Sequence, residues 1–294
     1  MDRILRCITS DGSIMAAAID STNIVYTAQH IHNTGAVATA ALGRLLTGAS
    51  VMGSMLKEEN ATVTLKINGG GPLGTIVAIA DSHGNCRGYV DNANVDLPLK
   101  TNGKLDVGSA VGKNGLLGVI RDFGKGNPYI GHVELISGEI AEDITNYYAT
   151  SEQVPTVCAL GVLVDKNDHK VLLAGGLLIQ VLPGADDTAI AKLEKNAATL
   201  EPITTMLAKG MSMEEICKKA LTGFDMEILD EFKIGYVCNC SKERVERAIS
   251  TLKPDEILTL ADEKGYMEAT CQYCDRSYQL TKQELIDIAG FASK

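Results

Sequence analysis

The chain has 294 residues, of which 45% are hydrophobic and 22% charged. This composition is typical of a folded globular protein and excludes a disordered or fibrous chain. The formal net charge of −10 provides no electrostatic basis for binding nucleic acid or an anionic membrane. The length predicts about two domains, or one large domain with an appendage.

The N-terminal residues show no apolar signal-peptide core, and the longest apolar run, Val171 to Val181, is too short to span a bilayer. We therefore expect a cytoplasmic protein. Structural disulfides are not expected in that reducing compartment, so the eight cysteines require another explanation.

Residues 1–181 are predicted to form an N-terminal core domain of the α+β class, with β-sheets packed around a central helix. Short runs of alternating apolar residues between Gly, Asn and Asp turns indicate its strands. We expect these strands at Ile4–Thr9, Ser13–Ile19, Ala61–Ile67, Leu73–Ala80, Asn85–Val90, Leu116–Arg121, Tyr129–Leu135, Thr156–Val164 and Lys170–Val181.

Ala36–Leu56 predicts the central helix, because it is rich in Ala, Leu and Met and has a single interior charge, Arg44. Its three interior glycines each weaken an isolated helix by up to ~1 kcal/mol relative to Ala. Close packing of the helix against a sheet would explain why they are tolerated. A second helix is expected over Gly138–Tyr148.

Residues 182–231 are predicted to form a helical linker, because strand patterning ends and helical spacing replaces it. Within it, Asp186–Glu231 carries ten acidic and five basic residues and four of the nine methionines. Two interpretations of its Met-bearing apolar face stay open, namely a plain packing face and a regulated or adhesive surface.

Residues 232–294 are predicted to form a third domain, which contains the strongest chemical signal in the chain. Cys238 and Cys240 form a C-x-C pair, and Cys271 and Cys274 form a C-x-x-C pair after a gap of 30 residues. Four thiolates can surround one Zn²⁺ tetrahedrally, so we predict one zinc ion per chain at these cysteines. Such a closed site leaves no position for substrate, and we predict no catalytic residues.

This zinc would be either permanent or released by oxidation. Its binding supplies roughly 10–16 kcal/mol, which is comparable to the whole stability of a typical domain at ~5–15 kcal/mol. Disulfides within each cysteine pair cannot replace the connection between the two halves of the domain, and their formation would release zinc and unfold it. Disulfides between the pairs could preserve the fold.

Other motifs are weaker. Gly69-x-Gly71-x-x-Gly74 matches a dinucleotide fingerprint, but a strand is expected after it, and no nucleoside triphosphate motif is found. His30 and His32 could bind a metal, although a polar loop beside a helix start is the preferred interpretation. The remaining cysteines are interpreted as solitary, buried apolar residues, at positions 7, 86, 158 and 217.

Three competing functions follow from the same cysteines. A zinc-ribbon nucleic-acid binder is disfavoured, because Glu231–Lys294 has nine basic and eleven acidic residues. A thiol oxidoreductase would need Cys271-x-x-Cys274 to open a helix, whereas strand patterns flank it. A purely structural zinc protein would gain no activity on oxidation.

The chain resembles the thirty-three-kilodalton heat-shock protein family, the redox-regulated holdase chaperones of bacteria, over essentially its whole length. The four-cysteine pattern is the most specific match. Other matching stretches are Ala40–Leu46, Gly70–Gly74, Arg87–Val90 and Tyr147–Thr156. Leu105–Asp122 offers no matching motif, and the client-binding surface is not assigned.

The resemblance implies an inactive, reduced, zinc-bound form. Oxidants such as peroxide with mild heat, or hypochlorous acid, would form Cys238–Cys240 and Cys271–Cys274 disulfides and release the zinc. The third domain and the linker would then unfold, exposing surface that holds unfolding client proteins without ATP during oxidative and heat stress. Active forms in the family are homodimers.

Overall fold

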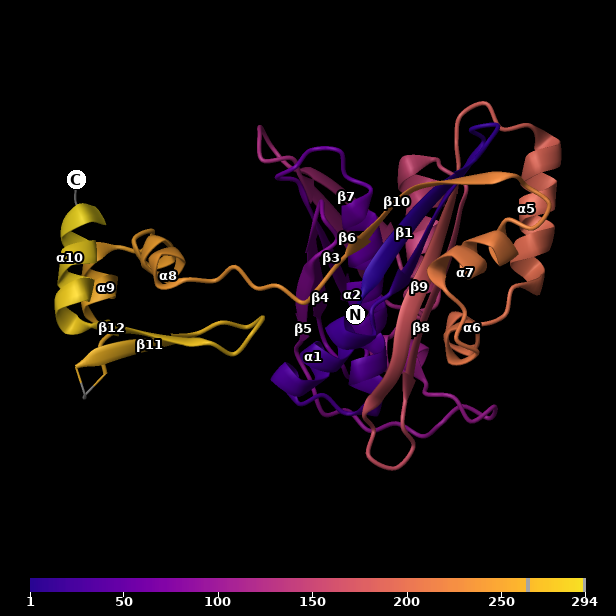
Figure 1. Cartoon of the computed structure of the whole chain (residues 1–294). Coiled ribbons are helices and arrows are strands. Elements are labelled where there is room, and N and C mark those ends of the chain that lie inside the picture. Colours follow the sequence, from indigo (N-terminus) through magenta and orange to yellow (C-terminus); the bar gives the residue numbers. More distant parts are fainter. Residues whose placement is uncertain (263–264, 293–294) are drawn as a thin grey trace. The chain divides into compact units, whose positions relative to one another are not determined.

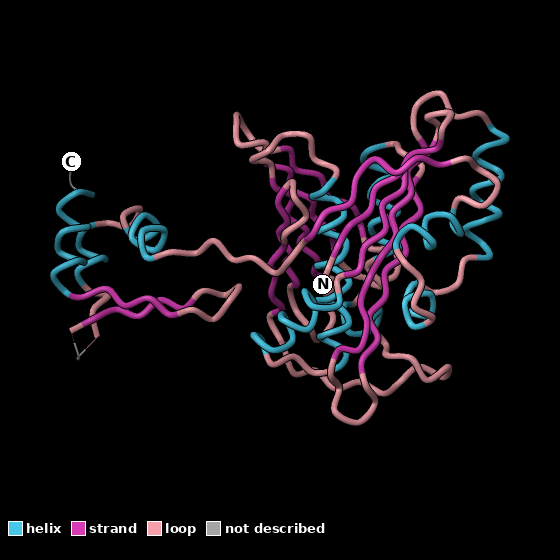
Figure 2. The backbone as a smooth tube through the Cα atoms, in the orientation of Figure 1, coloured by secondary structure: helices cyan, strands magenta, loops and turns pink. Residues whose placement is uncertain are grey.

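The computed structural model describes residues 1–262 and 265–292. The chain forms two compact units, Met1–Val237 and Cys238–Lys294. The first unit contains two five-stranded antiparallel sheets with a long helix between them, and helices cover the outer face of one sheet (Figures 1 and 2). The predicted α+β class is confirmed.

All nine predicted strands are present. The first sheet has the order β10-β1-β2-β9-β8, and the second has the order β5-β4-β3-β6-β7. In the first sheet the bounds are β1 Arg3–Thr9, β2 Ile14–Asp20, β8 Thr156–Val164, β9 Val171–Val181 and β10 Met226–Lys233. In the second they are β3 Thr62–Asn68, β4 Ile76–Asp81, β5 Cys86–Val90, β6 Leu116–Asp122 and β7 Tyr129–Glu134.

The central helix is α2, Ala36–Ser54, which packs against strands of both sheets. It is long and apolar enough to cross a membrane, but 89% of its most apolar window is buried inside the fold. Its interior charge, Arg44, pairs with Glu139 at 2.6 Å. A Cβ added at Gly53 would lie 2.5 Å from the Asp81 carbonyl oxygen. Close packing therefore explains the glycine, as predicted.

Several helices of the first unit differ from expectation. Thr22–His32 forms α1, and Val107–Val111 forms the short α3. The helix expected at Gly138–Tyr148 begins three residues later, as α4, Ala141–Tyr147, and continues as the π-helical turn η1, Tyr148–Glu152.

The segment predicted as a helical linker contains three helices, α5 Asp187–Thr199, α6 Ile203–Ala208 and α7 Met213–Ala220. We call these the linker helices. The prediction was wrong at its end, because Met226–Lys233 is β10 and pairs antiparallel with β1. This edge strand is mostly exposed, so its pattern lacks the apolar face that would have marked it.

The linker helices cover the outer face of the first sheet (Figure 1). On the helices, Met206 and Ile216 are fully buried, and Leu193 is nearly so. On the sheet, the apolar side chains that face them include Leu5, Ala16, Ala18, Leu177 and Ile179. This second apolar core is separate from the core around α2.

The C-terminal unit has a β-hairpin and three helices. Its elements are α8 Lys242–Ile249, α9 Pro254–Leu258, β11 Tyr266–Thr270, β12 Ser277–Thr281 and α10 Lys282–Ala292. A capping box precedes α10, since Thr281 and Glu284 exchange side-chain-to-backbone hydrogen bonds. Its core contains five buried apolar side chains, those of Ile249, Ile257, Leu280, Leu285 and Ala289.

We predict that Gly53→Ala lowers the free energy of unfolding by about 1–3 kcal/mol, because the new methyl group meets a fixed backbone carbonyl. Gly48→Ala in the same helix is the control. Its methyl group would meet only flexible side-chain tips, Ile144 Cδ1 at 2.7 Å and the Cδ1 atoms of Leu160 and Leu65 at 3.6 and 3.9 Å, and Ala gains up to ~1 kcal/mol of helix propensity. Denaturant unfolding measures both variants, and equal losses would contradict this packing argument.

Candidate metal centre

The four cysteines come from two separate loops of the C-terminal unit. Cys238 and Cys240 lie immediately before α8, whose N-cap is Ser241. Cys271 and Cys274 lie in the turn that joins β11 to β12. The strands flanking this turn were predicted from their alternating residues and are confirmed.

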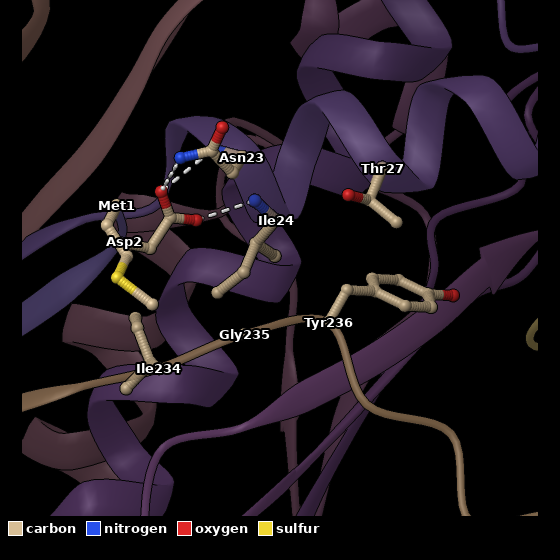
Figure 3. Close-up of a pocket in the computed structure, with 8 residues that line it drawn as sticks. All are labelled: Met1, Asp2, Asn23, Ile24, Thr27, Ile234, Gly235 and Tyr236. Carbon is tan, nitrogen blue, oxygen red and sulfur yellow. Dashed lines mark hydrogen bonds between the residues drawn. The ribbon is translucent and has the colours of Figure 1, made fainter.

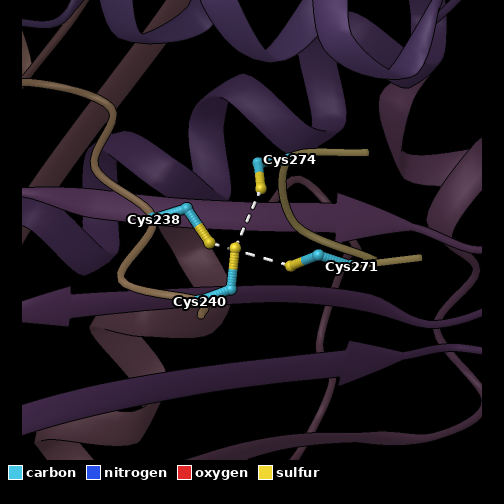
Figure 4. A group of neighbouring side chains, drawn as sticks. All are labelled: Cys238, Cys240, Cys271 and Cys274. Atoms are coloured by element: carbon cyan, nitrogen blue, oxygen red, sulfur yellow. Dashed lines mark hydrogen bonds between the residues drawn. The ribbon is translucent and has the colours of Figure 1, made fainter. Parts of the chain in front are cut away.

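The second turn presents its thiols through local backbone hydrogen bonds. The Cys271 amide donates to the Arg276 carbonyl at 3.0 Å, and the Asp275 amide donates to the Cys271 carbonyl at 2.9 Å. Asp275 has a positive φ of 55°, which reverses the chain within four residues. This tight reversal turns both cysteine side chains toward the first loop (Figure 4).

The four Sγ atoms lie within 4.8 Å of one another. Between the loops, Cys238 and Cys271 are 3.7 Å apart and Cys240 and Cys274 are 3.3 Å apart, sulfur to sulfur (Figure 4). Four sulfurs at about 2.3 Å from a tetrahedral Zn²⁺ would be about 3.8 Å from one another. The donor set and its spacing therefore fit a four-thiolate metal centre. Among the described residues, this is the one His, Cys, Asp or Glu group placed to hold a metal.

A neighbouring tyrosine adjusts the chemistry of one thiol. The Tyr278 hydroxyl donates to Cys240 Sγ at 3.1 Å. Partial burial raises the pKa of Cys240, but the hydrogen bonds from Tyr278 and the neighbouring thiols outweigh it and lower this pKa to about 7. For Cys274, burial comes first among the causes that raise the pKa to about 12. Among the three thiols of this centre whose pKa is shifted, Cys240 is thus the most readily ionised.

Tyr278 was not among the site residues predicted from the sequence. Its only signal there is its position four residues after Cys274 in a strand with alternating exposure. Alternating exposure in β12 turns one of its faces inward. That this face meets the C-x-C loop can be seen only in the folded structure.

The other candidate residues do not join this group. His30 and His32 lie in the last turn of α1, so the predicted polar loop was wrong. His32 Nε2 is 2.9 Å from the Gly88 carbonyl oxygen. Gly69 and Gly71 allow their loop to contact the backbone at Gly112, where a Cβ would clash, and β4 rather than a helix follows. The dinucleotide fingerprint is therefore a packing feature.

The four solitary cysteines are only partly as predicted. Cys7, Cys86 and Cys217 are buried, and Cys158 is half-buried. Cys7 and Cys217 are not solitary, however, because they share an apolar cluster, and interaction between their thiols lowers the pKa of Cys7 and raises the pKa of Cys217.

A cavity of about 440 Å³ lies beside α1 in the first unit (Figure 3). In its wall, Asp2 accepts hydrogen bonds from the backbone amides of Asn23 at 2.9 Å and Ile24 at 2.6 Å. Burial raises the pKa of this carboxyl group, against the effect of these bonds. The carboxylate caps the N-terminus of α1, so its interactions are structural.

The structure does not meet the requirement of the thiol oxidoreductase alternative. Cys271 and Cys274 occupy a hairpin turn, whereas a reactive C-x-x-C motif uses the N-terminus of a helix to stabilise its thiolate.

Comparison with known proteins assigns the chain to a family. The family model described as Hsp33 protein matches residues 2–281. The 33 kDa chaperonin of Acetivibrio thermocellus is 47% identical, with 97% of this chain and 96% of that protein covered. For the 33 kDa chaperonin of Bacillus licheniformis the identity is 46%, with 97% and 98% covered. The crystal structure of the 33 kDa chaperonin from Thermotoga maritima matches with a TM-score of 0.88 at 32% identity, covering 99% of this chain and 98% of that one. The chain belongs to the Hsp33 family of chaperones.

Proposed function

We propose that this protein is a redox-regulated, ATP-independent holdase that binds unfolding proteins under oxidative and heat stress. The observation that carries the proposal is the convergence of four thiols from two loops 30 residues apart in a unit with a small apolar core. Family membership supports the chaperone activity. The switch is argued from the residues below.

The reduced form holds one zinc ion through Cys238, Cys240, Cys271 and Cys274. The softness and charge of four thiolates suit zinc, and their spacing fits a tetrahedron. Bound there, zinc cross-links the loop before α8 to the turn after β11. Among its described residues, five buried apolar side chains and the partly buried ones around them form the remaining core of this unit, so we expect its folding to depend on the metal.

Oxidation forms Cys238–Cys240 and Cys271–Cys274 disulfides and releases the zinc. For each disulfide, two thiolates give up two electrons, which together with two protons from solvent reduce one hydrogen peroxide to two waters. The structure does not select this pairing, since the sulfur–sulfur contacts at 3.7 Å and 3.3 Å run between the loops. The family resemblance supports it. Local disulfides leave the two loops unconnected, so the unit unfolds.

The proposed switch also requires the linker to detach. The segment before Cys238 is held by contacts within the first unit, because Cys86 exchanges backbone hydrogen bonds with Gly235 and Val237 while β10 pairs with β1. We propose that unfolding of the C-terminal unit, which follows this segment directly in the chain, spreads to the exposed edge strand β10 and then to the linker helices. Their detachment would uncover both sides of the second apolar core, which we propose as the client-binding surface.

We propose core 1–181, linker 182–231 and redox domain 232–294 as a division of roles, although β10 crosses its second boundary and the compact C-terminal unit begins at Cys238. We propose that the active form is a cytoplasmic homodimer that uses no ATP and binds no nucleic acid or membrane. The acidic balance of the chain supports the last two points. We assign no catalytic residues.

We predict that Cys271→Ser abolishes stoichiometric zinc binding in reduced protein, because the hydroxyl group is a poor substitute for a thiolate ligand. Zinc content by mass spectrometry and amide exchange of the C-terminal unit should fall together. Cys158→Ser, which changes a thiol on β8, is the control and should keep one zinc per chain. Full zinc occupancy in Cys271→Ser would contradict the ligand assignment.

We predict that peroxide at elevated temperature releases zinc, lowers helicity and produces aggregation suppression in parallel, since unfolding of the C-terminal unit links the three. Peptide mapping should find disulfides within each cysteine pair. Oxidised protein with bridges between the pairs, a compact C-terminal unit and full activity would contradict the switch.

We predict that Ile216→Ala destabilises the packing of α7 by about 2–5 kcal/mol, because it removes a fully buried side chain. Reduced, zinc-loaded protein should then suppress client aggregation without oxidant. Lys218→Ala, at a side chain 60% exposed on the same helix, serves as the control. An inactive reduced Ile216→Ala protein with a demonstrably detached α7 would exclude the linker surface as the client site.

A further inference from the structure

Two buried thiols meet where the linker packs on the core. Cys7 lies in β1 and Cys217 lies in α7, and both side chains are 0% exposed. They are more than 200 residues apart in the sequence, yet they belong to the same apolar cluster, in which α7 packs against β1 and β2. Interaction between the two thiols lowers the pKa of Cys7 and raises the pKa of Cys217, so the sulfurs lie near each other on facing surfaces of the sheet and the helix.

This contact has no counterpart at the other two cysteines of the first unit. Cys86 belongs to the core around α2, and Cys158 packs against it from β8. Among the described residues, no other cysteine contributes to the shift in the pKa of either thiol. The Cys7–Cys217 contact therefore joins a strand of the stable core to a helix that the proposed function requires to detach.

We propose that Cys7 and Cys217 are a second disulfide-forming pair, whose oxidation ties α7 to β1 and limits the release of the linker. The inference rests on the proposed function. In chemical terms, one thiolate attacks hydrogen peroxide and becomes a sulfenic acid with loss of hydroxide. The second thiol then displaces water from that sulfur and closes the disulfide. Overall, two thiols and one peroxide give one disulfide and two waters.

Burial sets the order of events. The four cysteines of the metal centre are all partly exposed, whereas Cys7 and Cys217 are covered by α7 itself. Oxidant reaches the buried pair only when α7 opens, so this disulfide forms after those of the C-terminal unit. Because the sulfurs are already neighbours in the packed state, the bond retains α7 near its folded position. It therefore opposes the activation that the first oxidation begins.

The test uses the full-length, zinc-loaded protein treated with hydrogen peroxide at elevated temperature. Samples are quenched over time with N-ethylmaleimide and mapped by mass spectrometry without reduction. We expect a peptide pair linked through Cys7 and Cys217, appearing after zinc release. No variant is needed for this readout, so impaired folding cannot confuse it.

The functional consequence is tested with Cys217→Ala, with Cys86→Ala as the matched control for loss of a buried thiol. After oxidation, proteolytic cleavage within α7 should be at least about tenfold faster in Cys217→Ala than in wild type or Cys86→Ala. Aggregation suppression should be greater, and the rate of zinc release should be unchanged.

The outcomes separate the two proposals. If zinc is released and the chain becomes active but no Cys7–Cys217 linkage forms, the second pair is disproved while the switch stands. A linkage that leaves α7 cleavage equal in all three proteins also overturns its proposed role. If the linkage forms and slows α7 cleavage, while zinc is retained and no activity appears, the holdase switch fails instead.

Discussion

The structure of the C-terminal unit depends on bringing four thiols to one point. The loop before α8 and the turn between β11 and β12 are far apart in sequence, and the apolar core that joins their supporting elements is small. Without a ligand, four thiols at 3.3–4.8 Å are only weakly attractive neighbours. A metal would turn the same geometry into a strong cross-link. Under the proposed function, the unit would thus depend for its folding on a centre that an oxidant can destroy.

The first unit is built on the opposite principle. Its core around α2 is closed by two sheets and uses close backbone contacts at Gly53 and Gly69 that tolerate no added atom. Among the described residues, this packing includes no group placed to hold a metal. The linker helices belong to neither the core around α2 nor the C-terminal unit. They bury a separate apolar layer against the first sheet. Their position makes them the element whose attachment can change while the core remains folded.

Features encoded locally could be predicted from the sequence, and features that depend on distant partners could not. Strand alternation, the apolar composition of α2 and the cysteine spacing were all visible in short windows. In contrast, α1 receives its N-terminal cap from Asp2, twenty residues before it, so its start was missed and His30 was misplaced. β10 is defined only by its pairing with β1. The Cys7–Cys217 contact was invisible for the same reason.

The two interpretations of the apolar face of the linker helices, as a packing surface and as an adhesive surface, therefore do not exclude each other. Met206, Met213 and Ile216 are buried against the sheet in this structure, and the same flexible apolar side chains would be adaptable contacts if the helices detached. What decides between these roles is the free energy that holds α7 in place. Zinc at one end of the chain and a thiol pair beneath α7 would shift that free energy in opposite directions when oxidised. In this arrangement, the extent of activation depends on which cysteines have reacted, and on their order.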